Sequence, residues 1–142
     1  MNWHFAAHES QLSGKSAIEL RHLESLLGEP MMLVSGDEIR CISNVCTHRG
    51  MLLVDGSCYR TTLQCPYHGR TFGLDVSMKS MPEFDLVEGF PAAEDDLRTF
   101  PTTSWKGLIF TGLQPSGMEA CLGEMESRVG WMPIEKFEYD NS

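Results

Sequence analysis

The chain has 142 residues, a formal net charge of -9 and a pI near 4.9. This length fits a single domain, and we expect one domain over residues 1–142. The negative charge argues against binding to nucleic acid, whose phosphates would repel it, and favours a protein partner with a basic docking face.

The N-terminal residues 1–9 contain neither a basic segment nor a long apolar run, so we expect no signal peptide and no membrane anchor. The next segment, residues 17–27, has a mixed pattern. Ser16 and Glu19 suit a helix capping box, whereas the apolar residues around Ile18 alternate as in a strand. The local pattern leaves both helix and strand open there.

The strongest local pattern lies at residues 31–43, where apolar runs on both sides of Gly36-Asp37 predict a β-hairpin. Further short apolar runs follow, separated by the Gly, Asp and Pro residues that are typical of turns. We expect these runs to form strands at 52–54, 58–63, 71–74 and 108–111. So many short strands predict an all-β domain.

Near the C-terminus the pattern changes to that of a helix over residues 117–129. Ser116 and Glu119 suit a capping box at its start. Apolar residues share one face of this helix, and the simplest interpretation is that they contact the core. These residues are Met118, Cys121, Leu122, Met125 and Val129.

Two short blocks each combine one cysteine with one histidine, and they read Cys46-Thr47-His48 and Cys65-Pro66-Tyr67-His68. Two thiolates on one iron and two imidazoles on the other are the ligand set of a Rieske [2Fe-2S] cluster. A structural zinc site is the alternative, but zinc sites of this composition usually group the two cysteines together and the two histidines together. The predicted cluster and metal ligands are therefore Cys46, His48, Cys65 and His68.

Gly50 and Gly69 follow the two blocks closely, and Pro66 lies inside the second. Glycine lets the backbone turn tightly, whereas proline fixes one dihedral angle and stiffens the loop. We expect two loops that project from strand ends and form a small cluster-binding subdomain at about residues 44–75.

The sequence around both blocks resembles the Rieske domain of ring-hydroxylating oxygenase α subunits, including the choline- and carnitine-monooxygenase-like members. The resemblance runs over about residues 3–139 and includes Trp105. The parts that carry it are residues 44–50, 65–72, 78–84, 90–91 and 94–97. One departure is Val76, which stands where the family often has glycine, so a tight turn with positive φ is less secure there.

The resemblance implies an all-β Rieske (ISP-type) fold of antiparallel sheets, with the two-loop cluster-binding subdomain and a short C-terminal helix. It also favours a strand at residues 17–27. The function it implies is transfer of one electron from a reductase or ferredoxin to a mononuclear-iron centre in an oxygenase catalytic domain. A free-standing Rieske-type ferredoxin, which shuttles electrons between separate proteins, is the alternative.

In the respiratory branch of Rieske proteins each cluster loop carries a further cysteine, and the two form a disulfide. Met51 and Tyr67 stand at those positions here, and Arg70 replaces a serine that hydrogen-bonds toward the cluster. Fewer hydroxyl donors predict a potential near the bottom of the Rieske range of roughly −150 to +300 mV. The three spare cysteines show no pairing pattern, which predicts a reducing cytoplasm. They are Cys41, Cys58 and Cys121.

A mononuclear oxygenase iron is held by two histidines and one carboxylate, and the chain has no histidine after His68. His4, His8 and Glu9 could form such a triad, but they resemble a family segment whose histidines serve hydrogen bonding and packing. We therefore expect no catalytic residue in this chain. The apolar face at residues 117–129 could then pack against a catalytic domain outside it.

Overall fold

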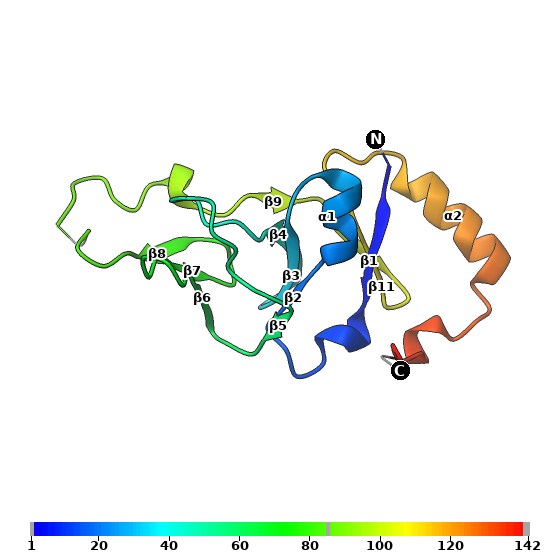
Figure 1. Cartoon of the computed structure of the whole chain (residues 1–142). Coiled ribbons are helices and arrows are strands. Elements are labelled where there is room, and N and C mark those ends of the chain that lie inside the picture. The colour runs from blue at the N-terminus through cyan, green and yellow to red at the C-terminus, as the bar shows by residue number, and fades with distance from the viewer. Residues whose placement is uncertain (1, 85, 141–142) are drawn as a thin grey trace.

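The computed structural model describes residues 2–84 and 86–140 and confirms the all-β class, with antiparallel sheets and few helices (Figure 1). The first sheet has the order β1 (His4–His8), β11 (Leu108–Thr111) and β10 (Thr102–Trp105). The second has the order β5 (Ser57–Cys58), β2 (Ala17–Glu19), β3 (Met31–Ser35), β4 (Ile39–Ser43) and β9 (Thr99–Phe100). The third has the order β6 (Thr62–Gln64), β7 (Thr71–Gly73) and β8 (Met78–Ser80).

Helices occupy the connections and the C-terminal part. The α-helices are α1 (Arg21–Leu27) and α2 (Met118–Val129), and the 3-10 helices are η1 (Glu9–Leu12), η2 (Ala93–Asp95) and η3 (Ile134–Lys136). None of the helices in the described ranges is long and apolar enough to cross a membrane.

Strand β3 is the centre of the fold because both of its faces are buried. Its alternate side chains point to opposite faces, so Met32 and Val34 enter one apolar cluster while Met31 and Leu33 enter another. The hairpin predicted at 31–43 is confirmed as β3 and β4. The first of these clusters also includes Cys46 and Cys65 and extends under β7, so the core continues to the cysteine-histidine loops.

The segment 17–27 is only partly a strand, and the strand prediction is wrong after β2. Leu20 and Leu23 are buried in the second cluster, and this burial favours a helical turn over continued sheet pairing. Helix α1 ends at Gly28, which adopts a left-handed φ of 70° and donates its N–H to Glu24. The predicted capping box is also wrong, since the Ser16 hydroxyl accepts the Arg60 N–H instead.

Other predicted strands are confirmed, divided or lost. The runs at 71–74 and 108–111 become β7 and β11. The run at 58–63 divides into β5 and β6, which belong to different sheets because residues 59–61 are solvent-exposed between them. The run at 52–54 makes only an isolated bridge between Leu52 and Val45. The sequence pattern missed β1, β8, β9 and β10.

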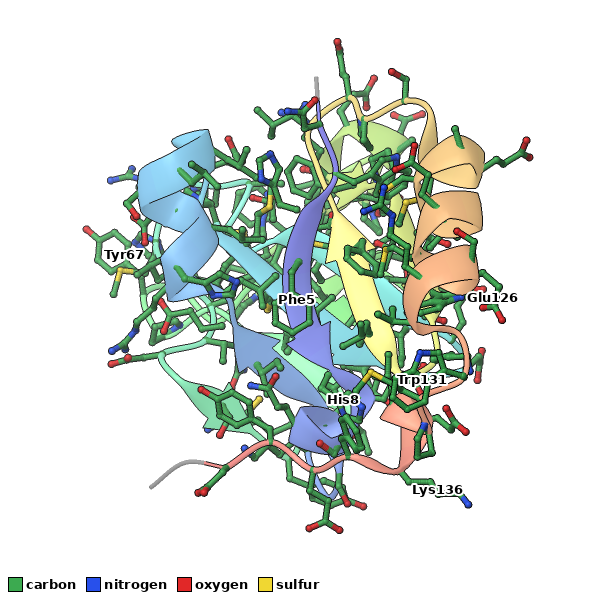
Figure 2. All side chains as sticks on the ribbon, turned by 90° about the vertical axis from the view of Figure 1, so that its right-hand side faces the viewer. Phe5, His8, Tyr67, Glu126, Trp131 and Lys136 are labelled. Atoms are coloured by element: carbon green, nitrogen blue, oxygen red, sulfur yellow. The ribbon has the colours of Figure 1, made fainter. Side chains whose placement is uncertain are left out.

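The predicted C-terminal helix is present as α2, but its apolar side chains do not enter the core. None of its residues is buried, and its N-cap is Gly117 in a left-handed conformation, without a side-chain cap. Polar contacts hold the helix: the Trp105 indole donates to Glu126 at 2.9 Å, and the Lys106 ammonium donates to the Gly130 carbonyl. Figure 2 shows α2 beside the sheet that contains β1 and β11.

The turn at Asp75-Val76 keeps a positive φ although glycine is absent. Val76 has a φ of 74°, which is uncommon for a β-branched residue. The Asp75 carboxylate stabilises the turn by accepting hydrogen bonds from the Ser77 hydroxyl at 2.7 Å and the Lys79 ammonium at 3.0 Å. The hydrogen bond from Ser77, followed by that from Lys79, lowers the pKa of Asp75 to about 2.

Candidate metal centre

The first cysteine-histidine loop follows β4 and closes on itself through the backbone. The Cys46 N–H donates to the Met51 carbonyl at 2.8 Å, and the Gly50 N–H donates back to the Cys46 carbonyl at 3.1 Å. Gly50 has a φ of 71°, a conformation that side chains disfavour. The loop therefore has a defined backbone in which the glycine is required.

The second loop, between β6 and β7, repeats these bonds. The Cys65 N–H donates to the Arg70 carbonyl at 2.8 Å, and the Gly69 N–H donates to the Cys65 carbonyl at 3.0 Å. Gly69 has a φ of 74°, and a Cβ atom there would lie 3.1 Å from Pro82. The two loops thus share a backbone pattern as well as their ligand types, a similarity that the sequence did not reveal.

Asn44 fixes the base of the first loop. Its fully buried side chain donates to the Val54 carbonyl at 2.7 Å and accepts the Val54 N–H at 2.9 Å. Its backbone carbonyl also accepts the Leu53 N–H at 3.1 Å. Sequence reasoning did not single out this residue, because an asparagine before a loop carries no signal of a partner ten residues away.

The structure brings the four predicted ligands together in two pairs. The Cys46 and Cys65 side chains lie inside and interact with each other, and these residues are only 2% and 3% exposed. The His48 and His68 rings are half-buried, with ring centroids 4.9 Å apart. Two buried thiols and two half-buried imidazoles match the ligand set of a cluster that takes cysteines on one iron and histidines on the other.

Burial and neighbouring charges set the protonation of these groups. Burial raises the pKa of the Cys46 thiol, and Cys65 raises it further, whereas the backbone N–H of His48 and the charge of Arg70 oppose this rise. Burial also lowers the pKa of His48, and the positive charges of His68, Arg70 and Arg49 lower it further. The metal-free site therefore favours a neutral Cys46 thiol and a neutral His48 imidazole, so metal binding at Cys46 must release a proton.

One ring nitrogen of His68 lacks a protein partner. Its Nδ1 atom is buried, and no hydrogen-bond partner for it exists among the described residues. Tyr67 packs against this ring with a centroid distance of 3.8 Å. An unpaired buried nitrogen costs roughly 1–3 kcal/mol, and a metal ion would be a suitable partner for it. The residues therefore fit a metal-bound group.

No three His, Cys, Asp or Glu side chains are grouped for one metal ion within the described ranges. A two-iron cluster takes only two side chains on each iron, so two pairs suffice. The imagined triad at His4, His8 and Glu9 has no free donor at His8, because both of its ring nitrogens are hydrogen-bonded. Nδ1 pairs with Ser10 at 2.9 Å, and Nε2 pairs with the Ile134 carbonyl at 3.2 Å. Figure 2 shows His8 beside this C-terminal segment.

Comparison with known proteins places these loops in a family. The choline monooxygenase of Beta vulgaris chloroplasts is 30% identical over 117 residues, and the match spans 80% of this chain and 25% of that protein. The carnitine monooxygenase oxygenase subunit of Acinetobacter baumannii is 30% identical over 115 residues, with 79% and 30% covered. The 2-halobenzoate 1,2-dioxygenase large subunit of Burkholderia cepacia is 29% identical over 131 residues, with 84% and 26% covered.

Solved structures agree with the fold. A quaternary ammonium Rieske monooxygenase in complex with L-carnitine superposes with a TM-score of 0.78 and 28% identity, over 91% of this chain and 37% of the other. Naphthalene 1,2-dioxygenase from a Rhodococcus species gives a TM-score of 0.74 and 27% identity, over 87% and 29%. The present chain spans about a quarter to a third of the length of the curated relatives it matches.

The family of Rieske [2Fe-2S] domains matches residues 2–100, which is more than half of the chain. Its matched range includes both cysteine-histidine loops, all of β1 to β9 and the turn at η2. The chain therefore belongs to the Rieske [2Fe-2S] domain family, whose cofactor is a Rieske-type cluster.

Proposed function

We propose that this chain is the electron-transfer domain of a Rieske oxygenase system, with Cys46 and Cys65 binding one iron and His48 and His68 the other. The bound cluster supplies a centre that accepts and releases one electron. The observation that carries the assignment is the buried, unpartnered Nδ1 of His68 in a loop that repeats the backbone of the Cys46 loop. Iron and sulfide analysis tests it, with about two of each expected per chain, and a single zinc that iron and sulfide cannot replace would contradict it.

The two cysteines and the two histidines differ in burial, and we assign them different roles for that reason. The buried Cys46 and Cys65 thiolates exclude water from the inner side, and the half-buried His48 and His68 rings form the path to solvent. An electron therefore enters and leaves at the imidazole edges. Tyr67, which is exposed and packs on His68, lies on the same surface. The electron donor and the electron acceptor should therefore dock on this surface.

The electron donor is a reductase or ferredoxin, and the acceptor is a mononuclear-iron oxygenase catalytic domain outside this chain. The relatives support this proposal, because they are subunits of mono- and dioxygenases. The structure of one relative, a quaternary ammonium Rieske monooxygenase, gives insight into electron transfer between the subunits of that enzyme. We place the domain in a reducing cytoplasm because the three cysteines that are not proposed ligands, Cys41, Cys58 and Cys121, form no disulfide.

The midpoint potential should lie near the bottom of the range of roughly −150 to +300 mV that Rieske centres span. Arg70 stands where the respiratory branch has a serine, and an absent hydroxyl donor favours the oxidised state. Protein-film voltammetry near neutral pH measures the potential. A clearly positive midpoint would contradict this prediction.

The same potential should fall as pH rises. His48 and His68 keep one ring nitrogen each for a proton, and a more positive iron repels that proton, so oxidation lowers the pKa of the ring. Above that lowered pKa the oxidised form loses a proton that the reduced form keeps. Reduction then takes up a proton and becomes less favourable at high pH. Voltammetry from neutral to alkaline pH tests this prediction, and a midpoint potential that does not change with pH over the accessible range would contradict it.

A further inference from the structure

Arg70 is a buried cation beside the candidate ligands. It lies two residues after His68, and its side chain is only 7% exposed. Arginine is rarely buried unless its charge is paired, so its position needs a physical reason. On one side its guanidinium carbon lies 5.7 Å from the centre of the Phe90 ring. Its other contacts are with Thr47 of the first ligand loop and with Asp95 of η2.

The polar contacts of Arg70 join three segments that are separate in sequence. Its Nη1 atom donates to the Thr47 hydroxyl at 2.7 Å, and Thr47 lies between Cys46 and His48. The Thr47 hydroxyl in turn donates to the Asp95 carbonyl at 2.8 Å. Nη1 of Arg70 also lies 3.2 Å from the Asp95 carboxylate. The arginine therefore ties the second loop to the first loop and to η2.

The charge of Arg70 is only partly balanced. Asp95 is more exposed, at 23%, and its other carboxylate oxygen accepts the Ala92 N–H at 3.0 Å. The Nε atom of Arg70 is buried and has no hydrogen-bond partner among the described residues. A buried donor without an acceptor is unfavourable, and His68, in the same loop, has a buried nitrogen in the same state.

We propose that Arg70 positions the two ligand loops through Thr47 and Asp95 and that its buried charge stabilises the reduced state of the cluster. The inference rests on the proposed function. Reduction by the electron donor adds one negative charge to the site. A positive charge nearby in a region of low dielectric favours that state, and a nearby negative charge opposes it. Arg70 and Asp95 should therefore affect the midpoint potential in opposite directions.

The test compares the variants Arg70→Gln, Asp95→Asn and Thr47→Val by voltammetry and iron analysis of the cluster-loaded protein. Arg70→Gln removes the positive charge and should shift the redox equilibrium about tenfold toward oxidation, a fall of about 59 mV for one electron. Asp95→Asn keeps the shape of the side chain without its charge and should raise the potential. Thr47→Val removes the tether without a charge, so it should speed cluster loss with little change in potential. Arg40→Gln, at a half-buried arginine paired with Glu38, is the matched control.

A fall in potential for Arg70→Gln together with a rise for Asp95→Asn supports the inference, because a purely structural role would not give shifts that follow the sign of the removed charge, and the reverse pair of shifts overturns it. Shifts in the same direction, or no shift in either variant, overturn it. If Arg70→Gln cannot hold the cluster, the potential of Asp95→Asn alone decides between these outcomes. A wild-type protein that holds no cluster overturns the proposed function itself, and the two failures are distinguishable by iron analysis.

Discussion

Replacing Cys65 with serine should abolish binding of the cluster. Serine keeps the shape of cysteine but offers a hydroxyl in place of the soft thiolate that iron–sulfur clusters use. The position is 3% exposed, so no solvent ligand can readily take its place. We expect iron and sulfide per chain to fall to near zero, and visible absorption together with metal analysis measures the loss.

The matched control is Cys121→Ser, because Cys121 is an exposed cysteine on α2. It should keep the full cluster content. Cys41 is not a substitute ligand, since it is fully buried in the second apolar cluster, whereas Cys46 and Cys65 belong to the first. A Cys65→Ser protein with a full cluster, or equal losses in both variants, would show that the ligand assignment is wrong.

Replacing Asn44 with alanine should give the second large effect, on stability. The change removes both side-chain hydrogen bonds to Val54 and leaves a buried N–H and a buried carbonyl without partners. Each of the two unpaired groups costs roughly 1–3 kcal/mol, so the free energy of unfolding should fall by about 2–6 kcal/mol. Urea denaturation followed by circular dichroism measures it. The first loop should also release its metal faster.

Asn2→Ala is the control, since Asn2 is exposed and the same atoms are removed. It should change the free energy of unfolding by less than about 0.5 kcal/mol. Equal stability of the Asn44 and Asn2 variants would mean that the Val54 contacts do not support the loop.

Local signals predicted the parts of the molecule that depend on short stretches of sequence. The hairpin at β3 and β4 follows from two apolar runs around a Gly-Asp turn, and the bounds of α2 follow from helical periodicity. The all-β class follows from the number of short runs, and the family comparison confirms the Rieske fold. The four ligands stood out because each block repeats one cysteine and one histidine, and their assignment stays a prediction.

The remaining features depend on contacts between distant segments. Residues 21–27 became a helix because Leu20 and Leu23 bury in the second apolar cluster. The bridge from Arg70 to Thr47 and Asp95 joins residues that are more than twenty positions apart, so no local pattern could indicate it. The apolar residues of α2 fit core packing equally well in sequence, and only the structure shows that none is buried.

The most direct test of the cluster assignment is the EPR spectrum of the dithionite-reduced protein. Histidine ligands on one iron give a mixed-valence cluster a lower average g value than four cysteines do. We expect a Rieske-type signal in the wild type and in Cys121→Ser, and its absence in Cys65→Ser. A spectrum typical of an all-cysteine cluster, or an EPR-silent protein that holds one zinc and fails to take up iron and sulfide, would contradict the assignment.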